Sequence, residues 1–252
     1  MDLFWLEETD IPEDAGFTLF GTEHIKAVVP ALISAGTLAF IYCRQRKLRK
    51  VILAVISILL PLIEISKIIF LQRAGHFGIG HLPLHLCSLS IILYPLYTII
   101  KPGRIRDFLG EFGCLILLPA GIGALLFPDW TMYPVISFMS LSSFAWHTLQ
   151  ITLPLCIIFA GEIDLKPKSI LCSTAFLLLV TIPVYLFDRH FSCNYFFLLR
   201  PVPGPLETVY EKFGITGYLP ALAILVILII LITYTVIHLL SHRRSAENPT
   251  LP

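Results

Sequence analysis

The chain has 252 residues and a formal net charge of +1; 56% of its residues are hydrophobic and 14% are charged. A soluble domain carries about 25% charged residues. This deficit, with a mean hydropathy of +0.83, therefore excludes an ordinary soluble fold. The near-neutral balance also argues against a nucleic-acid-binding protein. Lipid is the solvent that we predict for most of the chain.

The first 24 residues are acidic and have no basic segment before the first apolar stretch, which argues against a cleavable signal peptide. Long apolar segments follow, and about 20 apolar residues are needed to cross a ~30 Å hydrocarbon core. We predict seven transmembrane helices, at 27–43, 51–72, 82–100, 108–126, 136–159, 169–187 and 217–240. Several contain a proline, which membrane helices tolerate. The predicted fold class is all-α, with one seven-helix domain over residues 1–240.

Basic residues orient these helices, because short cytoplasmic loops are rich in lysine and arginine. Twelve of the eighteen basic residues lie in alternate connections and the C-terminal tail, at 44–50, 101–106, 166–168 and 243–244. This asymmetry predicts an N-terminus outside and a C-terminus in the cytoplasm, which requires an odd number of crossings. We expect a multi-pass protein of the plasma membrane.

The segments outside the predicted helices are short, with one exception. The outer connection at about 188–216 contains prolines at 201, 203 and 205, which prevent a regular helix there. Residues 241–252 are predicted to form a short, disordered cytoplasmic tail. The six cysteines include no Cys-x-x-Cys pair, so neither a disulfide framework nor a cysteine zinc site is expected.

Ionisable residues inside a membrane are costly, and are therefore candidates for function. Glu64 and Lys67 lie on the second predicted helix, three residues apart and so on one helix face. A structural ion pair and a functional site explain this spacing equally well. His85 and Cys87 lie near the start of the third helix, which places His85 roughly 5–12 Å below the outer interface at 1.5 Å per residue. A hydrogen-bonded interfacial histidine is the simpler interpretation of His85, and a chemical role is the alternative.

His147 lies near the middle of the fifth predicted helix, with Gln150 one turn further on. An imidazole suits acid–base chemistry near neutral pH. The alternative is a buried structural histidine whose hydrogen bonds are satisfied.

The other histidines carry weaker signals. His76 and His81 lie close to His85, but their glycine-rich surroundings and the lack of a carboxylate nearby in sequence indicate a polar turn. We therefore expect no metal and no cofactor. The remaining histidines are interpreted as interfacial residues, at positions 24, 190, 238 and 242.

Three blocks of sequence together resemble the bacterial YwaF-like integral membrane proteins, which are grouped with eukaryotic transmembrane protein 164. The blocks are His81-Leu-Pro-Leu-His85-Leu-Cys87-Ser-Leu, the mid-helix His147, and Asn194-Tyr195-Phe-Phe-Leu. The resemblance covers most of the chain. It also includes the Glu64/Lys67 pair, the run from Gly121 to Pro128, and Pro154 after His147.

This resemblance implies acyltransferase-type chemistry that remodels phospholipids with a cysteine and a histidine. The related androgen-induced family of fatty-acid-ester hydrolases implies a threonine and a histidine. The position that matches the nucleophilic cysteine is Leu84 here, which cannot attack an ester. Cys87 lies about one helical turn further on and is the first substitute, with Ser88 the second.

We therefore predict a histidine-centred pocket in the outer half of the membrane. His147 would be the general base, His85 would orient the nucleophile or stabilise the oxyanion, and Cys87 would attack a lipid ester. Four further residues are predicted to contact the substrate, namely Glu64, Lys67, Asn194 and Tyr195. Membrane lipids are the expected partners, as acyl donor and acceptor.

Two other classes of function use the same polar residues. A small-solute transporter or a proton-relay channel is the main alternative, although the two halves of the chain show no match of the kind found in many transporters. A binding or scaffold protein is the third. Geometry discriminates between them, because an enzyme needs His85 and His147 to reach a common point.

Overall fold

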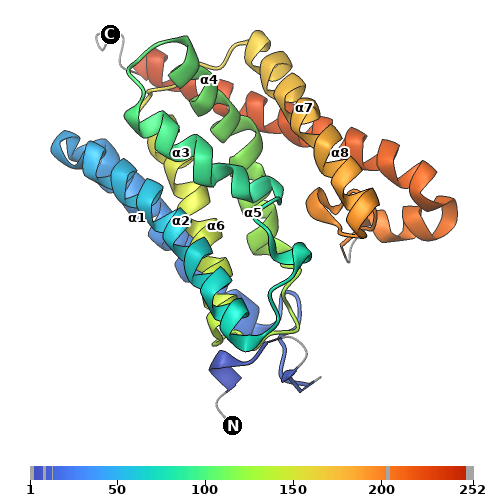
Figure 1. The fold of residues 1–252 in the computed structure, drawn as a ribbon. Coiled ribbons are helices and arrows are strands. Elements are labelled where there is room, and N and C mark those ends of the chain that lie inside the picture. The colour runs from blue at the N-terminus through green and yellow to red at the C-terminus, as the bar shows by residue number, and fades with distance from the viewer. Residues whose placement is uncertain (1–2, 8–9, 13, 203–204, 248–252) are drawn as a thin grey trace.

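A computed structural model describes residues 3–7, 10–12, 14–202 and 205–247, which form helices and no strands (Figure 1). The predicted all-α class is therefore confirmed for the described part of the chain. Within it, six helical segments are long and apolar enough to cross a membrane. They are α1 (Thr22–Arg44), α2 (Arg49–Ala74), the continuous run of α4 and α5, α6 (Phe138–Phe159), α7 (Pro167–Phe191) and α8 (Pro205–Glu247).

The run of α4 and α5 is one helix with a wider turn in the middle. α4 (Arg104–Phe112) leads into a π-helical turn (Gly113–Leu117), and α5 (Leu118–Leu126) follows. Pro119 explains the interruption, because its ring would clash with the carbonyl four residues earlier in a regular α-helix. Such π-helical turns are rare and occur frequently at functional sites.

The predicted third helix is shorter than expected. α3 (Ser90–Ile99) is preceded by the 3₁₀ turns η4 (Ile79–His81) and η5 (Leu86–Leu89). Helical residues from Leu86 to Ile99 span about 21 Å at 1.5 Å per residue, less than the ~30 Å of a hydrocarbon core. The chain returns from α2 through an irregular segment, residues 75–85, because Gly75 ends α2 in a left-handed conformation with φ +78°.

The C-terminal part of the chain is more helical than the sequence suggested. α7 extends to Phe191 and α8 already begins at Pro205, so the irregular part of the outer connection is shorter than predicted. Proline is tolerated at the first position of a helix, and Gly214 (φ +61°) kinks α8 instead of ending it. α8 also continues to Glu247, and residues 248–252 lie outside the described part, so the disorder of the 241–252 tail stays a prediction.

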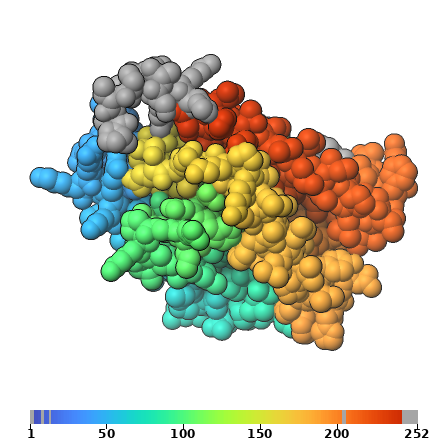
Figure 2. Space-filling model, turned by 90° about the horizontal axis from the view of Figure 1, so that it is seen from above, coloured from blue at the N-terminus to red at the C-terminus, as the bar shows by residue number. Residues whose placement is uncertain are grey.

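Two groups of helices differ in how deeply they are buried. α6 packs against α1, α2 and α5. In the most apolar 18-residue stretch of α4–α5, and likewise in that of α6, 61% is buried inside the protein. The corresponding stretches of α7 and α8 are 17% and 11% buried, and Figure 2 shows these two helices, orange to red, along one side of the molecule. The core is thus built around α6, and α7 and α8 expose mostly apolar side chains.

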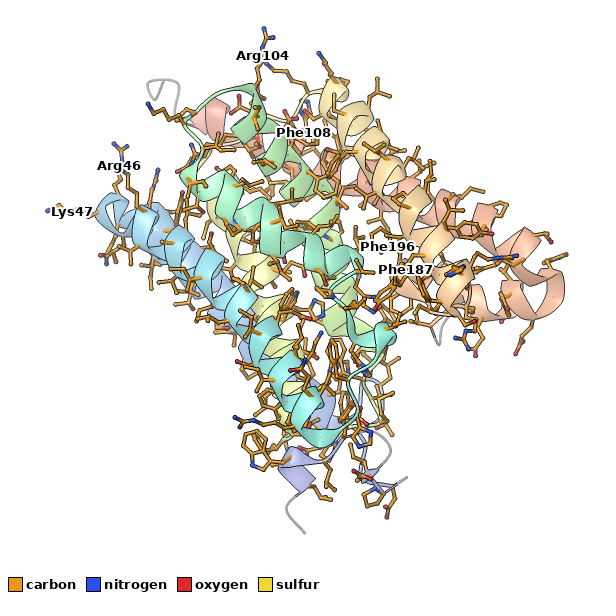
Figure 3. The ribbon with its side chains drawn as sticks, in the orientation of Figure 1. Arg46, Lys47, Arg104, Phe108, Phe187 and Phe196 are labelled. Carbon is orange, nitrogen blue, oxygen red and sulfur yellow. The ribbon has the colours of Figure 1, made fainter. Side chains whose placement is uncertain are left out.

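The two ends of the bundle also differ. The α1–α2 and α3–α4 connections lie at one end, from which Arg46, Lys47 and Arg104 project, and the residues Leu3–Trp5 lie at the other (Figure 3). A shared basic end is what the orientation derived from the sequence requires. The number of seven crossings and the placement of the termini remain predictions.

Candidate functional site

His85 lies where the irregular segment 75–85 meets η5. Its ring packs edge-on against Tyr195, with ring centroids 4.8 Å apart, and lies 5.7 Å from the ring of Phe197. A surface-open cavity of about 240 Å³ is lined here by Gly80, His85, Asp129, Asn194, Tyr195 and Phe197. The structure therefore brings three of the predicted site residues to one cavity from two distant parts of the chain.

One wall of the cavity is the loop between α7 and α8, which we call the loop wall (residues 192–200). Tyr195 joins it to two other elements, since its backbone N–H donates to Asp188 Oδ1 of α7 (3.0 Å) and its hydroxyl donates to the Ile79 carbonyl. Burial raises the pKa of Tyr195 to about 12, so the hydroxyl keeps its proton near neutral pH. Figure 3 shows Phe196 of this loop and Phe187 of α7 on the side of α7 that faces α3.

The Asn194 side chain makes three hydrogen bonds within the loop wall. Its Oδ1 accepts from the N–H groups of Leu199 and Arg200, both at 3.0 Å, and its Nδ2 donates to the Arg200 carbonyl at 3.0 Å. Phe197 has a left-handed backbone (φ 56°), which is unfavourable for a bulky residue, and its carbonyl accepts from the Tyr218 hydroxyl of α8. The loop wall is thus joined by hydrogen bonds to α7, to α8 and to the segment 75–85.

A second buried polar group lies on α6, behind the residues that line the cavity, and is called the α6 wall (His147 and Gln150, with Trp130 beside them). His147 is 9% exposed and stacks on Trp130, with the two rings 5.3 Å apart and inclined by 5°. Gln150 is fully buried, and its Nε2 donates to the Leu117 carbonyl at 2.8 Å. By contrast, His147 Nδ1, Gln150 Oε1 and Trp130 Nε1 are buried without a partner of hydrogen-bond geometry.

Electrostatic contacts connect the two walls. His147 and His85 lie close enough for the charge of one to affect the other, and the Gln150 side chain lies within interaction distance of both His147 and Cys87. Gln150 therefore lies beside two of the predicted trio, Cys87 and His147, and His147 lies near the third, His85. Sequence reasoning noted Gln150 beside His147 without assigning it to the site.

The Glu64/Lys67 pair lies near this cluster. Glu64 is buried and forms an ion pair with Lys67, with 2.7 Å between Oε1 and Nζ, as their spacing on one helix face predicted. Lys67 lies within electrostatic range of His85, and Glu64 within that of Tyr195. Whether the pair binds substrate stays a prediction.

Two other histidines have partners that their sequence neighbours did not reveal. His76 faces two carboxylates of the N-terminal segment, with Nδ1 3.7 Å from Glu7 Oε2 and Nε2 3.5 Å from Asp10 Oδ2. His24 is fully buried within the protein, and its position at the membrane interface stays a prediction. Its Nδ1 accepts from the Phe20 N–H and its Nε2 donates to the Leu125 carbonyl, so it is a structural contact between α1 and α5.

The fold and the buried polar cluster define a polytopic helical membrane protein. In a comparison with known protein families, the family model of TMEM164 matches residues 19–239. The chain therefore belongs to the TMEM164 family. Comparison with curated proteins and with solved structures gives no match.

Proposed function

We propose that this protein is a membrane-embedded lipid acyltransferase or lipid-ester hydrolase whose reaction centres on His147. The observation that carries the proposal is the environment of this side chain: a buried imidazole with an unpartnered nitrogen, close to a second histidine and to Gln150, whose side chain also lies near Cys87. Buried polar atoms are normally hydrogen-bonded, so an exception beside a cavity is a candidate for chemistry.

The proposed reaction begins with transfer of the Cys87 thiol proton to His147. The thiolate attacks the carbonyl carbon of a lipid ester, and His85 donates a hydrogen bond to the oxyanion that forms. Collapse of this intermediate breaks the ester C–O bond, and His147 returns the proton to the leaving alcohol. An acyl thioester remains on Cys87. A lysolipid hydroxyl or water then attacks the thioester carbonyl while His147 takes its proton, the C–S bond breaks, and the proton returns to the Cys87 thiolate.

We further propose seven crossings, with the N-terminus outside and the plasma membrane as the location. The irregular segment 75–85 and the helical residues Leu86–Ile99 would together complete the third crossing. Irregular backbone is tolerated at membrane depth where protein covers it or where it lines a cavity, and this segment supplies Gly80 and His85 to one. His85 would then lie in the outer part of the bilayer, where an acyl chain enters sideways.

The test is turnover by the purified full chain in phospholipid nanodiscs, with a lipid labelled in its acyl chain and a lysophospholipid acceptor. Loss of a general base typically costs 10²–10⁴-fold, so we expect His147→Ala to lower turnover by about that factor. Cys87→Ala should abolish a hydroxylamine-sensitive acyl adduct. His190→Ala, at the exposed end of α7, is the control and should keep full activity.

Cells provide a second readout. Cells that lack the protein should show an altered phospholipid acyl profile that wild type restores and His147→Ala does not. If acyl profiles are unchanged in every strain and the purified protein turns over no ester, the enzyme proposal is wrong. Solute or proton flux through proteoliposomes would then favour the transporter. Full activity of Cys87→Ala alone would exclude the covalent cysteine and leave the histidine role standing.

A further inference from the structure

Two groups outside its own helix hold Gln150, one at the side-chain amide nitrogen and one at the backbone carbonyl. Its Nε2 donates to the carbonyl of Leu117, the last residue of the π-helical turn, and its backbone carbonyl accepts from the Tyr94 hydroxyl at 2.6 Å. Gly121 allows this close approach, because a Cβ there would lie 2.7 Å from Ile151 Cγ2 and 3.3 Å from Gln150 Nε2. The packing of α5 on α6 therefore fixes where this amide points.

The contact with Leu117 also settles which end of the amide faces which way. A backbone carbonyl only accepts hydrogen bonds, so the amide nitrogen must face Leu117 and the oxygen must face the other direction. His147 lies one turn away on the same helix face and within interaction distance. Gln150 Oε1 and His147 Nδ1 are both buried, and neither has another partner of hydrogen-bond geometry.

We infer that Gln150 is a positioning residue that accepts the Nδ1 proton of His147 and so fixes the tautomer of the imidazole. This inference rests on the proposed function. With Nδ1–H directed to the amide, the Nε2 lone pair is free to take the proton from the Cys87 thiol, and Nδ1–H is unchanged by that transfer. Catalytic hydrogen bonds are often long or poorly aligned without substrate, which agrees with the unpaired geometry of these two atoms.

The choice of an amide also suits the surroundings. In many hydrolases a carboxylate orients the histidine, but an isolated carboxylate is costly to bury. Gln150 is 0% exposed in the centre of a bundle that we take to span a membrane. A neutral acceptor held by a backbone carbonyl gives the same orientation without a buried charge.

Two substitutions separate this role from simple packing. Gln150→Met keeps the volume of the side chain and removes both the donor and the acceptor. We expect kcat to fall about 100-fold with little change in KM, because the base is no longer oriented. Gln150→Glu, while protonated, can donate to Leu117 and present an oxygen to His147. Burial raises the pKa of a carboxyl, so this variant should keep activity near neutral pH and lose it as the pH rises. Ser173→Ala removes another buried, unpartnered hydroxyl, on α7, and should change neither parameter.

The tautomer can be measured without any turnover. Side-chain ¹⁵N spectra of the histidine-labelled full chain report which nitrogen of His147 carries the proton, with the signal assigned by its loss in His147→Gln. We expect Nδ1–H in wild type and a mixture of tautomers in Gln150→Met. A wild-type Nε2–H signal, or an unchanged tautomer in Gln150→Met, overturns the inference. If wild type turns over no lipid ester, the proposed function fails while these spectra still decide the role of Gln150.

Discussion

The two buried histidines, His24 and His147, differ in whether their ring nitrogens are hydrogen-bonded. His24 joins α1 to α5, and both of its ring nitrogens are hydrogen-bonded to backbone groups. His147 is also buried, yet its Nδ1 has no partner of hydrogen-bond geometry, and its ring stacks on Trp130 beside a cavity-lining cluster. Burial alone therefore does not distinguish a structural histidine from a candidate catalytic one.

The same contrast holds between the two walls of the site. In the loop wall, the Asn194 amide and the Tyr195 hydroxyl are paired with backbone groups. In the α6 wall, acceptor or donor capacity is left unused on His147 and Gln150. An unpaired buried polar atom costs about 1–3 kcal/mol. We interpret the loop wall as the rigid support and the α6 wall as the part that would react.

The largest effect on stability that separates these regions is expected for His24→Ala. It removes a buried ring and leaves the Phe20 N–H and the Leu125 carbonyl without their partners. Cavity formation and two unpaired groups together should lower the free energy of unfolding by about 2–4 kcal/mol. The measurement is the midpoint of thermal unfolding in detergent, with turnover normalised to folded protein. A variant with wild-type stability would show that His24 is not the structural contact described here.

A smaller effect is expected for Asn194→Ala in the loop wall. Three hydrogen bonds to Leu199 and Arg200 are lost, but this loop lies nearer the surface, so stability should fall by about 1–2 kcal/mol. Because Asn194 lines the cavity and its side chain bonds within the loop, KM should rise more than kcat falls. Steady-state kinetics with the labelled phospholipid measure both. A loss confined to kcat would place Asn194 in the chemistry, contrary to its interpretation as support.

Most of the fold followed from apolar segment lengths and loop charges, because lipid imposes those two constraints on any helical span. The third segment did not, since its helix starts late only because the chain around Gly75 and Gly78 turns back along the bundle. Composition also gave no sign that α8 would continue through Gly214 to Glu247. These features depend on packing between segments that are distant in sequence.

The candidate site was predicted only in part, again because some of its contacts join segments that are distant in sequence. His85 and His147 stand out because titratable residues are rare in apolar segments. His24 looked interfacial because it lies near the start of α1, and only the contact with Leu125 shows that it is buried. The position of Gln150 depends on the carbonyl of Leu117 in a π-helical turn, and no pattern of residue types reveals which carbonyl such a turn presents.

The smallest effect is expected for Tyr195→Phe, which tests whether the loop wall acts through its hydrogen bonds or through its rings. The ring can stay against His85 while the bond to the Ile79 carbonyl is lost, so stability should fall by about 1 kcal/mol. Burial raises the pKa of Tyr195 from its ordinary value of 10.0 to about 12, so folding favours the protonated hydroxyl. This contribution is complete below pH 10 and is lost as the pH rises toward 12.

The stability difference between wild type and Tyr195→Phe should therefore be constant from pH 6 to about pH 10 and shrink above it, as measured by denaturation at a series of pH values. The bond to the Ile79 carbonyl comes from Tyr195. Tyr210→Phe is therefore the matched variant, which controls for the loss of a tyrosine hydroxyl elsewhere. A difference that changes between pH 6 and 8 would mean that a histidine, most directly His85 against the same ring, titrates with the contact. The loop wall would then belong to the reacting part of the site and not to its support.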